Sequence, residues 1–379
     1  MTLAFLDARL TALRTEGLYR DPEQESVRRR LVSAHPALLD VSSNDYLGLA
    51  RRDVPRETLT LPRAGSGASR LIHGTHPPHR DLEQTLAEWT GHADALLFSS
   101  GYAANVGLLS SLPQAGDSVF SDALNHASII DGCRLSRATT FVYPHLSLEA
   151  LGAALAQAPS DGERWVVSET LFSMDGDRPD LSRLRDLCDV HGAHLILDEA
   201  HALGILGPAG AGLAASAGIA PDALVGTFGK AIGTAGAFVA GSKTLRTWLW
   251  NRARSFIYST APPPSMTAVT LHHVRQARDA AHLRDHLFQL CRRFSSAAAT
   301  RGLPIPPHSP GPIFPVVLGD LHRLETAATH LRAAGILAHG IRPPTVPPGT
   351  ARLRITLTAS LSFADIDRLA DALHTACHE

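Results

Sequence analysis

The sequence predicts an α/β protein with a large, mostly parallel sheet and a smaller C-terminal α/β unit. Short apolar segments alternate with helical segments from about residue 80 to 245. These segments are almost continuously apolar, which is typical of strands that are buried on both faces of a parallel sheet. The chain length of 379 residues exceeds what one simple core holds, so we expect more than one domain.

The elements of the large sheet follow in chain order after an N-terminal helix and arm. That helix is expected because Leu3, Leu6, Leu10 and Leu13 recur at helical spacing between charged residues. The expected strands are 94–100, 117–122, 139–143, 164–169, 194–200, 223–228 and 236–241. Helices are expected at 82–89, 101–112 and 178–191.

The C-terminal part follows a proline-rich stretch, 259–265, and a long helical region that runs to about residue 300. We expect a turn, a strand, a helix and a second strand at 302–312, 313–319, 321–334 and 352–358. Ser362 and Asp365 have the spacing of a capping box and predict the start of a final helix. The expected divisions are an N-terminal helix and arm (1–45), a large domain (46–280) and a small C-terminal domain (281–379).

Composition excludes several classes of protein. The formal net charge of −1 gives no bulk attraction to nucleic acid or to anionic membranes. The four cysteines form no C-x-x-C pair, which favours a reducing compartment such as the cytoplasm. We expect neither a signal peptide nor a membrane span, because no apolar run approaches about 18 residues. A zinc site at His73, His76 and His79 is disfavoured, because the intervening prolines prevent helical pairing of these ligands.

The candidates for chemistry fall where the predicted strands end. Asp198 ends an apolar strand and His201 follows it, and ligands of parallel sheets bind at the carboxyl ends of strands. Capping of the next helix is an equally good explanation of Asp198 taken alone. Gly101 and Tyr102 begin a helix directly after a strand, where free N–H groups favour a phosphate.

Lys230 is one of only two lysines, and the other is Lys243. It follows a strand that ends at Thr227, and its small neighbours leave room around it. A solvated loop lysine is the alternative. An acid, a phosphate cradle and a lysine at the ends of one sheet's strands suit pyridoxal phosphate, which needs a lysine for its Schiff base and an acid at its ring nitrogen.

Seven motifs then identify a family by resemblance. In order they are SSNDYLGL (42–49), GSGASRLIHGTHPPHRDLE (65–83), LNHASIIDG (124–132), ETLFSMDGD (169–177), LDEAHALG (197–204), TFGKAIGTAGA (227–237) and IRPPTVPPGTARLRITLTA (341–359). The chain resembles the α-oxoamine synthases, which are fold-type-I pyridoxal-phosphate enzymes, from about residue 40 onward. The resemblance implies a transferase with a large, mostly parallel sheet domain and a smaller C-terminal domain.

The resemblance also implies roles for individual residues. Lys230 would form the Schiff base and transfer protons, Asp198 would pair with the pyridine nitrogen, and His126 would stack on the ring and contact substrate. The other implied cofactor contacts are His201 and Ser173 near the phenolic oxygen, and Gly101, Tyr102 and Thr227 at the phosphate. The implied substrate contacts are Arg354 at the amino-acid carboxylate, with Arg20 and Thr345; Asn44, Ser259 and Thr260 are further candidates.

Segment 341–347 is similar to that of the family member that uses a pimeloyl thioester. It implies decarboxylative condensation of L-alanine with pimeloyl-CoA or pimeloyl-acyl-carrier protein, which gives 8-amino-7-oxononanoate for biotin biosynthesis. We hypothesise that Arg342 binds the distal pimeloyl carboxylate; a surface arginine held by Pro343 is the alternative. The family also implies a homodimer with shared active sites.

Three other functions are compatible with parts of the pattern. A sibling synthase, 5-aminolevulinate synthase or 2-amino-3-ketobutyrate CoA ligase, would use glycine. A non-catalytic subunit of the family would typically lack the Schiff-base lysine, and Lys230 argues against it. A pyridine-nucleotide-binding protein would lack the yellow colour that pyridoxal phosphate on a lysine produces.

Overall fold

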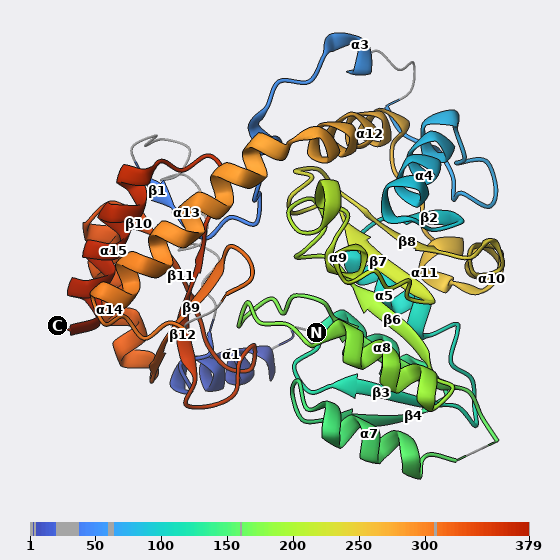
Figure 1. Cartoon of the computed structure of the whole chain (residues 1–379), viewed down its shortest axis with the longest axis horizontal. Coiled ribbons are helices and arrows are strands. Elements are labelled where there is room, and N and C mark those ends of the chain that lie inside the picture. Colours follow the sequence, from blue (N-terminus) through green and yellow to red (C-terminus); the bar gives the residue numbers. More distant parts are fainter. Residues whose placement is uncertain are drawn as a thin grey trace. The chain divides into compact units, whose positions relative to one another are not determined.

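The computed structural model describes residues 3, 5–19, 38–59, 64–159, 161–306 and 309–378. Its internal contacts divide the chain into two units (Figure 1). Unit 1 consists of Met1–Ser43 and Phe288–Glu379, and unit 2 is the continuous stretch Asn44–Leu287.

Unit 2 is built on a seven-stranded sheet with the order β2-β8-β7-β6-β5-β3-β4. The strands are β2 (Asp94–Phe98), β3 (Ser118–Asp122), β4 (Thr139–Tyr143), β5 (Arg164–Glu169), β6 (His194–Asp198), β7 (Ala223–Thr227) and β8 (Ala237–Gly241). Strands β4, β3, β5, β6 and β7 are parallel, whereas β8 runs antiparallel to both of its neighbours. The predicted fold class, α/β with a mostly parallel sheet, is confirmed.

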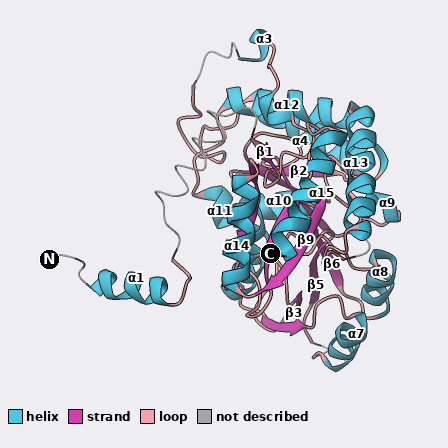
Figure 2. Ribbon diagram, turned by 90° about the vertical axis from the view of Figure 1, so that its left-hand side faces the viewer, coloured by secondary structure: helices cyan, strands magenta, loops and turns pink. Residues whose placement is uncertain are grey.

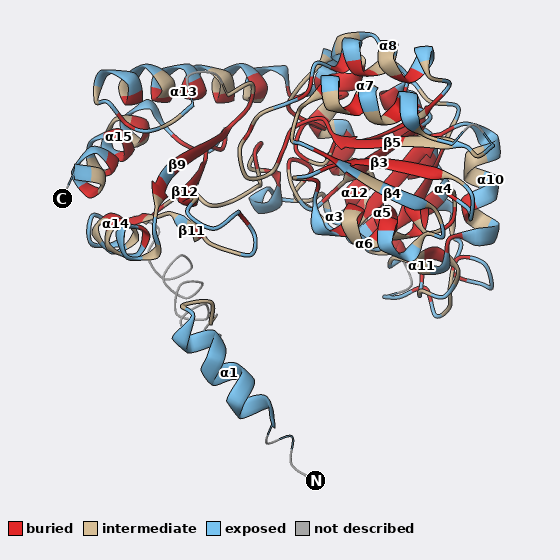
Figure 3. Cartoon of the chain, turned by 90° about the horizontal axis from the view of Figure 1, so that it is seen from below, coloured by how far each residue is buried: buried red, intermediate tan, exposed pale blue. Residues whose placement is uncertain are grey.

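Helices cover both faces of this sheet. They are α3 (Arg56–Leu59), α4 (Pro77–Thr90), α5 (Gly101–Leu109), α6 (Ala127–Leu135), α7 (Leu148–Gln157), α8 (Leu181–Val190), α9 (Leu213–Ala217), α10 (Lys243–Arg252), α11 (Arg254–Ile257) and α12 (Pro264–Asp279), with 3-10 turns at η1 (Leu49–Arg51) and η2 (Pro208–Gly210). Helices α5, α6, α10 and α11 contribute to one core cluster with alternate residues of the strands. In Figure 2, α7 and α8 lie outside strands β3 and β6, which they contact. Burial on both faces explains the continuous apolar strands (Figure 3).

The reversal of strand β8 shapes the Lys230 segment. Because β8 is antiparallel to β7, residues 228–236 form a connection between adjacent strands at the carboxyl end of β7. The Phe228 N–H donates to the Gly236 carbonyl at 2.9 Å, and the Thr234 N–H donates to the Phe228 carbonyl at 2.8 Å. This connection therefore holds Lys230 at the edge where the parallel strands also end.

Unit 1 contains two small sheets. β9 (Ile313–Gly319), β12 (Ala351–Thr356) and β11 (His339–Ile341) are antiparallel in the order β11-β12-β9, and β1 (Leu39–Asp40) pairs in parallel with β10 (Ile336–Leu337). The helices are α1 (Phe5–Thr15), α13 (Ala281–Thr300), which starts seven residues before this unit, α14 (Leu321–Ala333) and α15 (Phe363–His378). The predicted capping box of α15 is confirmed, because the Ser362 N–H donates to Asp365 Oδ2 at 2.8 Å and the Asp365 N–H donates to Ser362 Oγ at 3.2 Å. Among the described helices, none combines the length and apolarity needed to cross a membrane.

Candidate active site

Two buried carboxylates lie side by side at the edge of the large sheet that is formed by the C-terminal ends of its parallel strands. Glu169 ends β5 and Asp198 ends β6, and the two residues are register partners. One oxygen of Asp198 accepts the Ala200 N–H at 2.8 Å, and the other accepts the Asn105 side-chain amide at 2.7 Å. Asp198 is therefore fixed on both oxygens, as expected for an acid that must hold a defined position against a ligand.

His126 caps helix α6 close to these carboxylates. The backbone N–H of His126 donates to Glu169 Oε1 at 2.6 Å, and the ring Nδ1 of His126 lies 2.7 Å from Ser128 Oγ. Removal from water lowers the pKa of His126 and raises the pKa of Glu169 to about 8. The negative charge of Asp198 raises the pKa of His126 and that of Glu169, and the positive charge of Lys230 lowers the pKa of each of them. All four residues thus share one electrostatic environment, and the neutral form of His126 is favoured.

Lys230 is half-buried in the connection between β7 and β8. Gly233, three residues later, has φ +69°, and a Cβ on it would lie 2.4 Å from the Ala50 backbone nitrogen. At this position the small residue serves close packing of two backbones. Lys243 is the exposed first residue of α10, outside this environment.

The start of helix α5 faces Thr227. Ser100 caps the helix by accepting the Ala103 N–H at 3.1 Å, and helix geometry leaves the N–H groups of Gly101 and Tyr102 available at the helix end. A Cβ on Gly101 would lie 3.7 Å from both Cβ and Oγ1 of Thr227. Two N–H groups thus lie beside the Thr227 hydroxyl, which donates to the Gly236 carbonyl at 3.2 Å; N–H groups at a helix start together with a hydroxyl are a donor set that suits a phosphate. The Tyr102 side chain is directed elsewhere, because its hydroxyl bonds to Asp131.

His201 lies buried in the turn after β6. Its Nδ1 is 2.6 Å from the Tyr46 hydroxyl, which also donates to Asn44 Oδ1 at 3.3 Å. Tyr46 is fully buried, so the SSNDYLGL motif supports His201 through this tyrosine. Ser173 is half-buried in the turn between β5 and α8, where the Phe172 N–H donates to the Asp177 carbonyl at 2.9 Å.

Of the predicted substrate residues, Arg354, Thr345 and Arg342 belong to unit 1 and His126 belongs to unit 2, whereas Arg20 lies outside the described residues. Arg354 and Arg352 are both buried on β12, whereas Leu353 and Ile355 point into the core, as expected from strand alternation. Arg354 donates to Thr356 Oγ1 at 2.8 Å, and Arg352 Nε donates to the Thr350 carbonyl at 3.0 Å.

Segment 342–345 forms a turn in the same unit. The Thr345 N–H donates to the Arg342 carbonyl at 3.1 Å. A guanidinium nitrogen of Arg342 donates to the Tyr19 carbonyl at 2.5 Å, and Arg342 is half-buried.

Sequence reasoning missed three members of the site. Glu169 ends a predicted strand in the same way as Asp198, so the signal that selected Asp198 was present for it. Asn105 and Tyr46 carry no such signal, because their roles depend on which helix or loop packs beside β6. In HGTHPPH, the His79 side chain is bound within unit 2: the His76 backbone N–H donates to His79 Nδ1 at 3.1 Å, and His79 Nε2 lies 2.9 Å from the Pro262 carbonyl.

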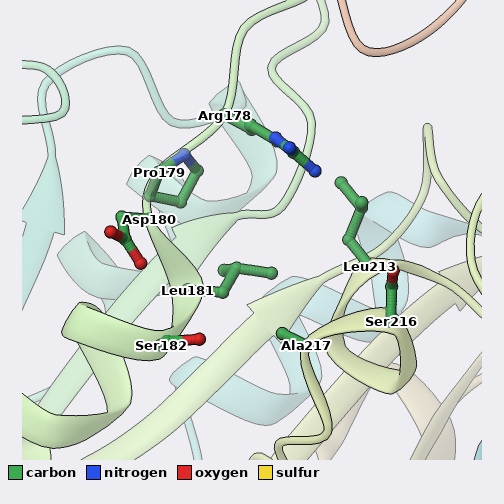
Figure 4. Close-up of a pocket in the computed structure, with 8 residues that line it drawn as sticks. All are labelled: Arg178, Pro179, Asp180, Leu181, Ser182, Leu213, Ser216 and Ala217. Carbon is green, nitrogen blue, oxygen red and sulfur yellow. The ribbon is translucent and has the colours of Figure 1, made fainter.

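A surface pocket of unit 2 lies apart from these residues, between the start of α8 and helix α9 (Figure 4). It is lined by Arg178, Pro179, Asp180, Leu181, Ser182, Leu213, Ser216 and Ala217. None of these residues is a predicted site residue, so the pocket does not alter the assignment of the site to the carboxyl edge of the sheet.

Comparisons with known proteins show which family the chain belongs to. The model of the family described as aminotransferase class I and II matches residues 36–373. Proteins named 8-amino-7-oxononanoate synthase are 45% identical in Anaeromyxobacter dehalogenans strain 2CP-1, with 98% of this chain and 95% of the relative covered, and 45% identical in Alkalilimnicola ehrlichii, with 96% and 95% covered.

Solved structures show the same architecture. Serine palmitoyltransferase from S. paucimobilis, as a variant with a bound PLP–myriocin aldimine, has a TM-score of 0.86 and 30% identity, with 89% of this chain and 87% of that chain covered. The 8-amino-7-oxononanoate synthase from Francisella tularensis has a TM-score of 0.79 and 27% identity, with 90% and 98% covered. The chain therefore belongs to the aminotransferase class I and II family and, within it, to the α-oxoamine synthases.

Proposed function

We propose that the protein condenses L-alanine with a pimeloyl thioester, using pyridoxal phosphate, to give 8-amino-7-oxononanoate, the free thiol carrier and CO2 for biotin biosynthesis. The observation that carries this proposal is the convergence of Asp198, Lys230 and the start of α5 at one edge of the sheet. The choice of substrates follows the relatives that are 45% identical over nearly the whole chain.

The residues at this edge fit the cofactor. The N–H groups of Gly101 and Tyr102 and the hydroxyl of Thr227 would hold its phosphate. Asp198, held by Asn105 and Ala200, would pair with the ring nitrogen and keep it protonated. When bound, pyridoxal phosphate supplies an electron sink for the bonds at the α-carbon of the amino acid.

Lys230 moves the protons of the reaction. We assign Lys230 Nζ as the group that would hold the cofactor and would remove the proton from the α-carbon of bound alanine. After carbon–carbon bond formation and loss of CO2, the same amine returns a proton to that carbon. Arginine could not replace it, because a guanidinium stays protonated.

The remaining assignments concern orientation and selectivity. His126 would lie against the cofactor ring and contact the substrate, and His201 and Ser173 would lie at the phenolic oxygen. Arg354, with Thr345 and Arg20, holds the alanine carboxylate so that the correct bond at the α-carbon is presented to the ring. Arg342 binds the distal carboxylate of the pimeloyl chain. We further propose a cytoplasmic homodimer that shares its active sites.

A turnover assay across amino acids and thioesters tests the substrates. L-alanine, glycine and L-serine are each paired with pimeloyl-, succinyl- and palmitoyl-CoA, and thiol release is measured. We expect the alanine–pimeloyl pair to have a kcat/KM at least about 100-fold above the others, which corresponds to about 2.7 kcal/mol of transition-state discrimination. A preference for glycine would identify a sibling synthase instead.

Borohydride reduction tests the cofactor site with a matched control. After incubation with pyridoxal phosphate, reduction should fix the cofactor on the peptide that holds Lys230, and Lys230→Arg should abolish this labelling. Lys243→Arg should leave both labelling and turnover unchanged, because Lys243 is exposed at the start of α10. Labelling that follows Lys243 would contradict the site.

A further inference from the structure

Four side chains from three elements form one continuous hydrogen-bonded chain beneath the site. His126 Nδ1 lies 2.7 Å from Ser128 Oγ, the Asn105 amide nitrogen lies 3.0 Å from Ser128 Oγ, and the same nitrogen lies 2.7 Å from Asp198 Oδ2. Asn105, Ser128 and Asp198 are all buried. Water therefore does not compete for the bonds among Asn105, Ser128 and Asp198, whereas His126 is exposed at the end of the chain, and the donor and acceptor roles along the chain must be mutually consistent.

The direction of the chain is set at Asp198. An ionised carboxylate can only accept hydrogen bonds, so the NH2 group of Asn105 must face it. The opposite amide orientation would place the Asn105 oxygen 2.7 Å from a carboxylate oxygen. In the observed orientation, the two hydrogens of this NH2 group are directed to Asp198 and to Ser128 Oγ.

The orientation of Asn105 then fixes the hydroxyl of Ser128. Because Ser128 Oγ accepts from Asn105, its single hydrogen is available for His126 Nδ1. The Ser128 N–H also points to this nitrogen, at 3.2 Å. Two donors directed at His126 Nδ1 require that it carry no proton, so the proton of the neutral imidazole lies on Nε2.

We propose that Asn105 and Ser128 are positioning residues that transmit the negative charge of Asp198 to the tautomer of His126, so that His126 presents an Nε2–H donor to the substrate. The inference rests on the proposed function, in which His126 and Asp198 both face the bound cofactor. The pKa of His126 is lowered, chiefly by partial removal from water, which agrees with a neutral ring.

The tautomer matters because of what approaches His126. An Nε2–H group donates to a carboxylate or carbonyl oxygen of the substrate, whereas a bare Nε2 would repel the same oxygen. The acid that pairs with the ring nitrogen would thereby also set the polarity of the residue on the ring face. Asn105 and Ser128 do so without contacting substrate or cofactor.

Nitrogen NMR of the full-length protein tests the tautomer directly. Protein labelled with ¹⁵N-histidine is measured with and without pyridoxal phosphate, and the His126 signals are identified by their loss in His126→Gln. We expect an unprotonated Nδ1 and a protonated Nε2 for His126. A His126 that carries its proton on Nδ1, or on both nitrogens at neutral pH, overturns the proposal.

Variants of Ser128 test the transmission. Ser128→Ala should give His126 signals of mixed tautomers and lower kcat/KM about fivefold to tenfold, the value of one hydrogen bond. Ser128→Thr, which keeps the hydroxyl, should restore both. Ser111→Ala is the matched control, because Ser111 is also a buried serine but donates to the Gly107 carbonyl at 2.7 Å, away from the chain. An unchanged His126 spectrum in Ser128→Ala overturns the proposal.

The two proposals fail in different ways. If the His126 signals behave as expected but alanine and pimeloyl-CoA do not turn over, the assigned substrates are wrong and the positioning role of Asn105 and Ser128 stands. If turnover is as proposed but His126 carries its proton on Nδ1, the positioning role is wrong and the assigned function stands.

Discussion

Glu169 and Asp198 are register partners at the ends of adjacent parallel strands, and their side chains are almost fully buried, with 3% and 6% of each residue exposed. Burial and then the charge of Asp198 raise the pKa of Glu169 to about 8. The parallel register thus places two acids next to each other. Their repulsion is reduced because Glu169 stays protonated near neutral pH.

Substitution of Glu169 by glutamine should therefore change how stability depends on pH. The folded state keeps the Glu169 proton up to about pH 8, whereas the unfolded chain releases it near 4.5. The wild-type free energy of unfolding should accordingly fall between pH 5 and 8 by a contribution that Glu169→Gln lacks. Urea unfolding at both pH values should show the variant gaining stability relative to wild type as the pH rises. The exposed Glu88→Gln is the control, and equal pH dependence of Glu169→Gln and wild type would contradict the prediction.

His145 should stabilise the Ser173 turn as a charged group. Burial favours its neutral form, but bonds to Asp122 at 2.8 Å and Asp177 at 3.1 Å raise the pKa of His145 to about 10. Its contribution is full below about pH 6.5 and is lost as the pH rises through 10. His145→Gln should cost about 2 kcal/mol of unfolding free energy at pH 6. In urea melts that difference should shrink toward pH 10; a difference that grows with pH would contradict this, and the exposed His322→Gln serves as control.

Gly212 should be among the least replaceable residues of the chain. It has φ +103°, and a Cβ on it would lie 2.7 Å from the carboxylate of Glu199. Glu199 is held there by the N–H groups of Leu213 and Ala214, at 3.0 and 2.7 Å. Gly212→Ala should lower the unfolding free energy by about 3 kcal/mol, because backbone strain and a clash add. Gly218→Ala, at φ +67° with nothing within 4 Å, should cost only about 1 kcal/mol. Equal losses in thermal melts would show that the clash is relieved.

Arg342 should control affinity for the acyl chain and not the chemistry. Its guanidinium is anchored by a bond to the Tyr19 carbonyl at 2.5 Å. If Arg342 binds the distal carboxylate of the pimeloyl chain, Arg342→Ala should raise the KM for pimeloyl-CoA about tenfold or more and leave the KM for alanine unchanged. Steady-state kinetics with each substrate varied in turn measure this. An unchanged KM for pimeloyl-CoA would leave Arg342 as a purely structural residue.

The sheet could be predicted from the sequence because its strands are apolar on both faces and are separated by recognisable helices. Asp198, Thr227 and Lys230 could be predicted because each ends or follows such a strand, and the family motifs added roles. The ladder of β1 and β10 could not, since two-residue strands show no periodicity. Asn105 and Ser128 could not either, since their importance arises only when α5 and α6 pack beside β6.

The pairing of strand β1 affects the order in which the protein folds during synthesis. Leu39 pairs with Ile336, so β1 cannot form its ladder until β10, almost three hundred residues later, has been synthesised. Unit 2 is continuous and contains all of its own strands, so it can reach its sheet first. A chain that ends before residue 336 would therefore contain Lys230 and the large sheet but lack Arg354. We expect such a chain to bind the cofactor more readily than it turns over substrate.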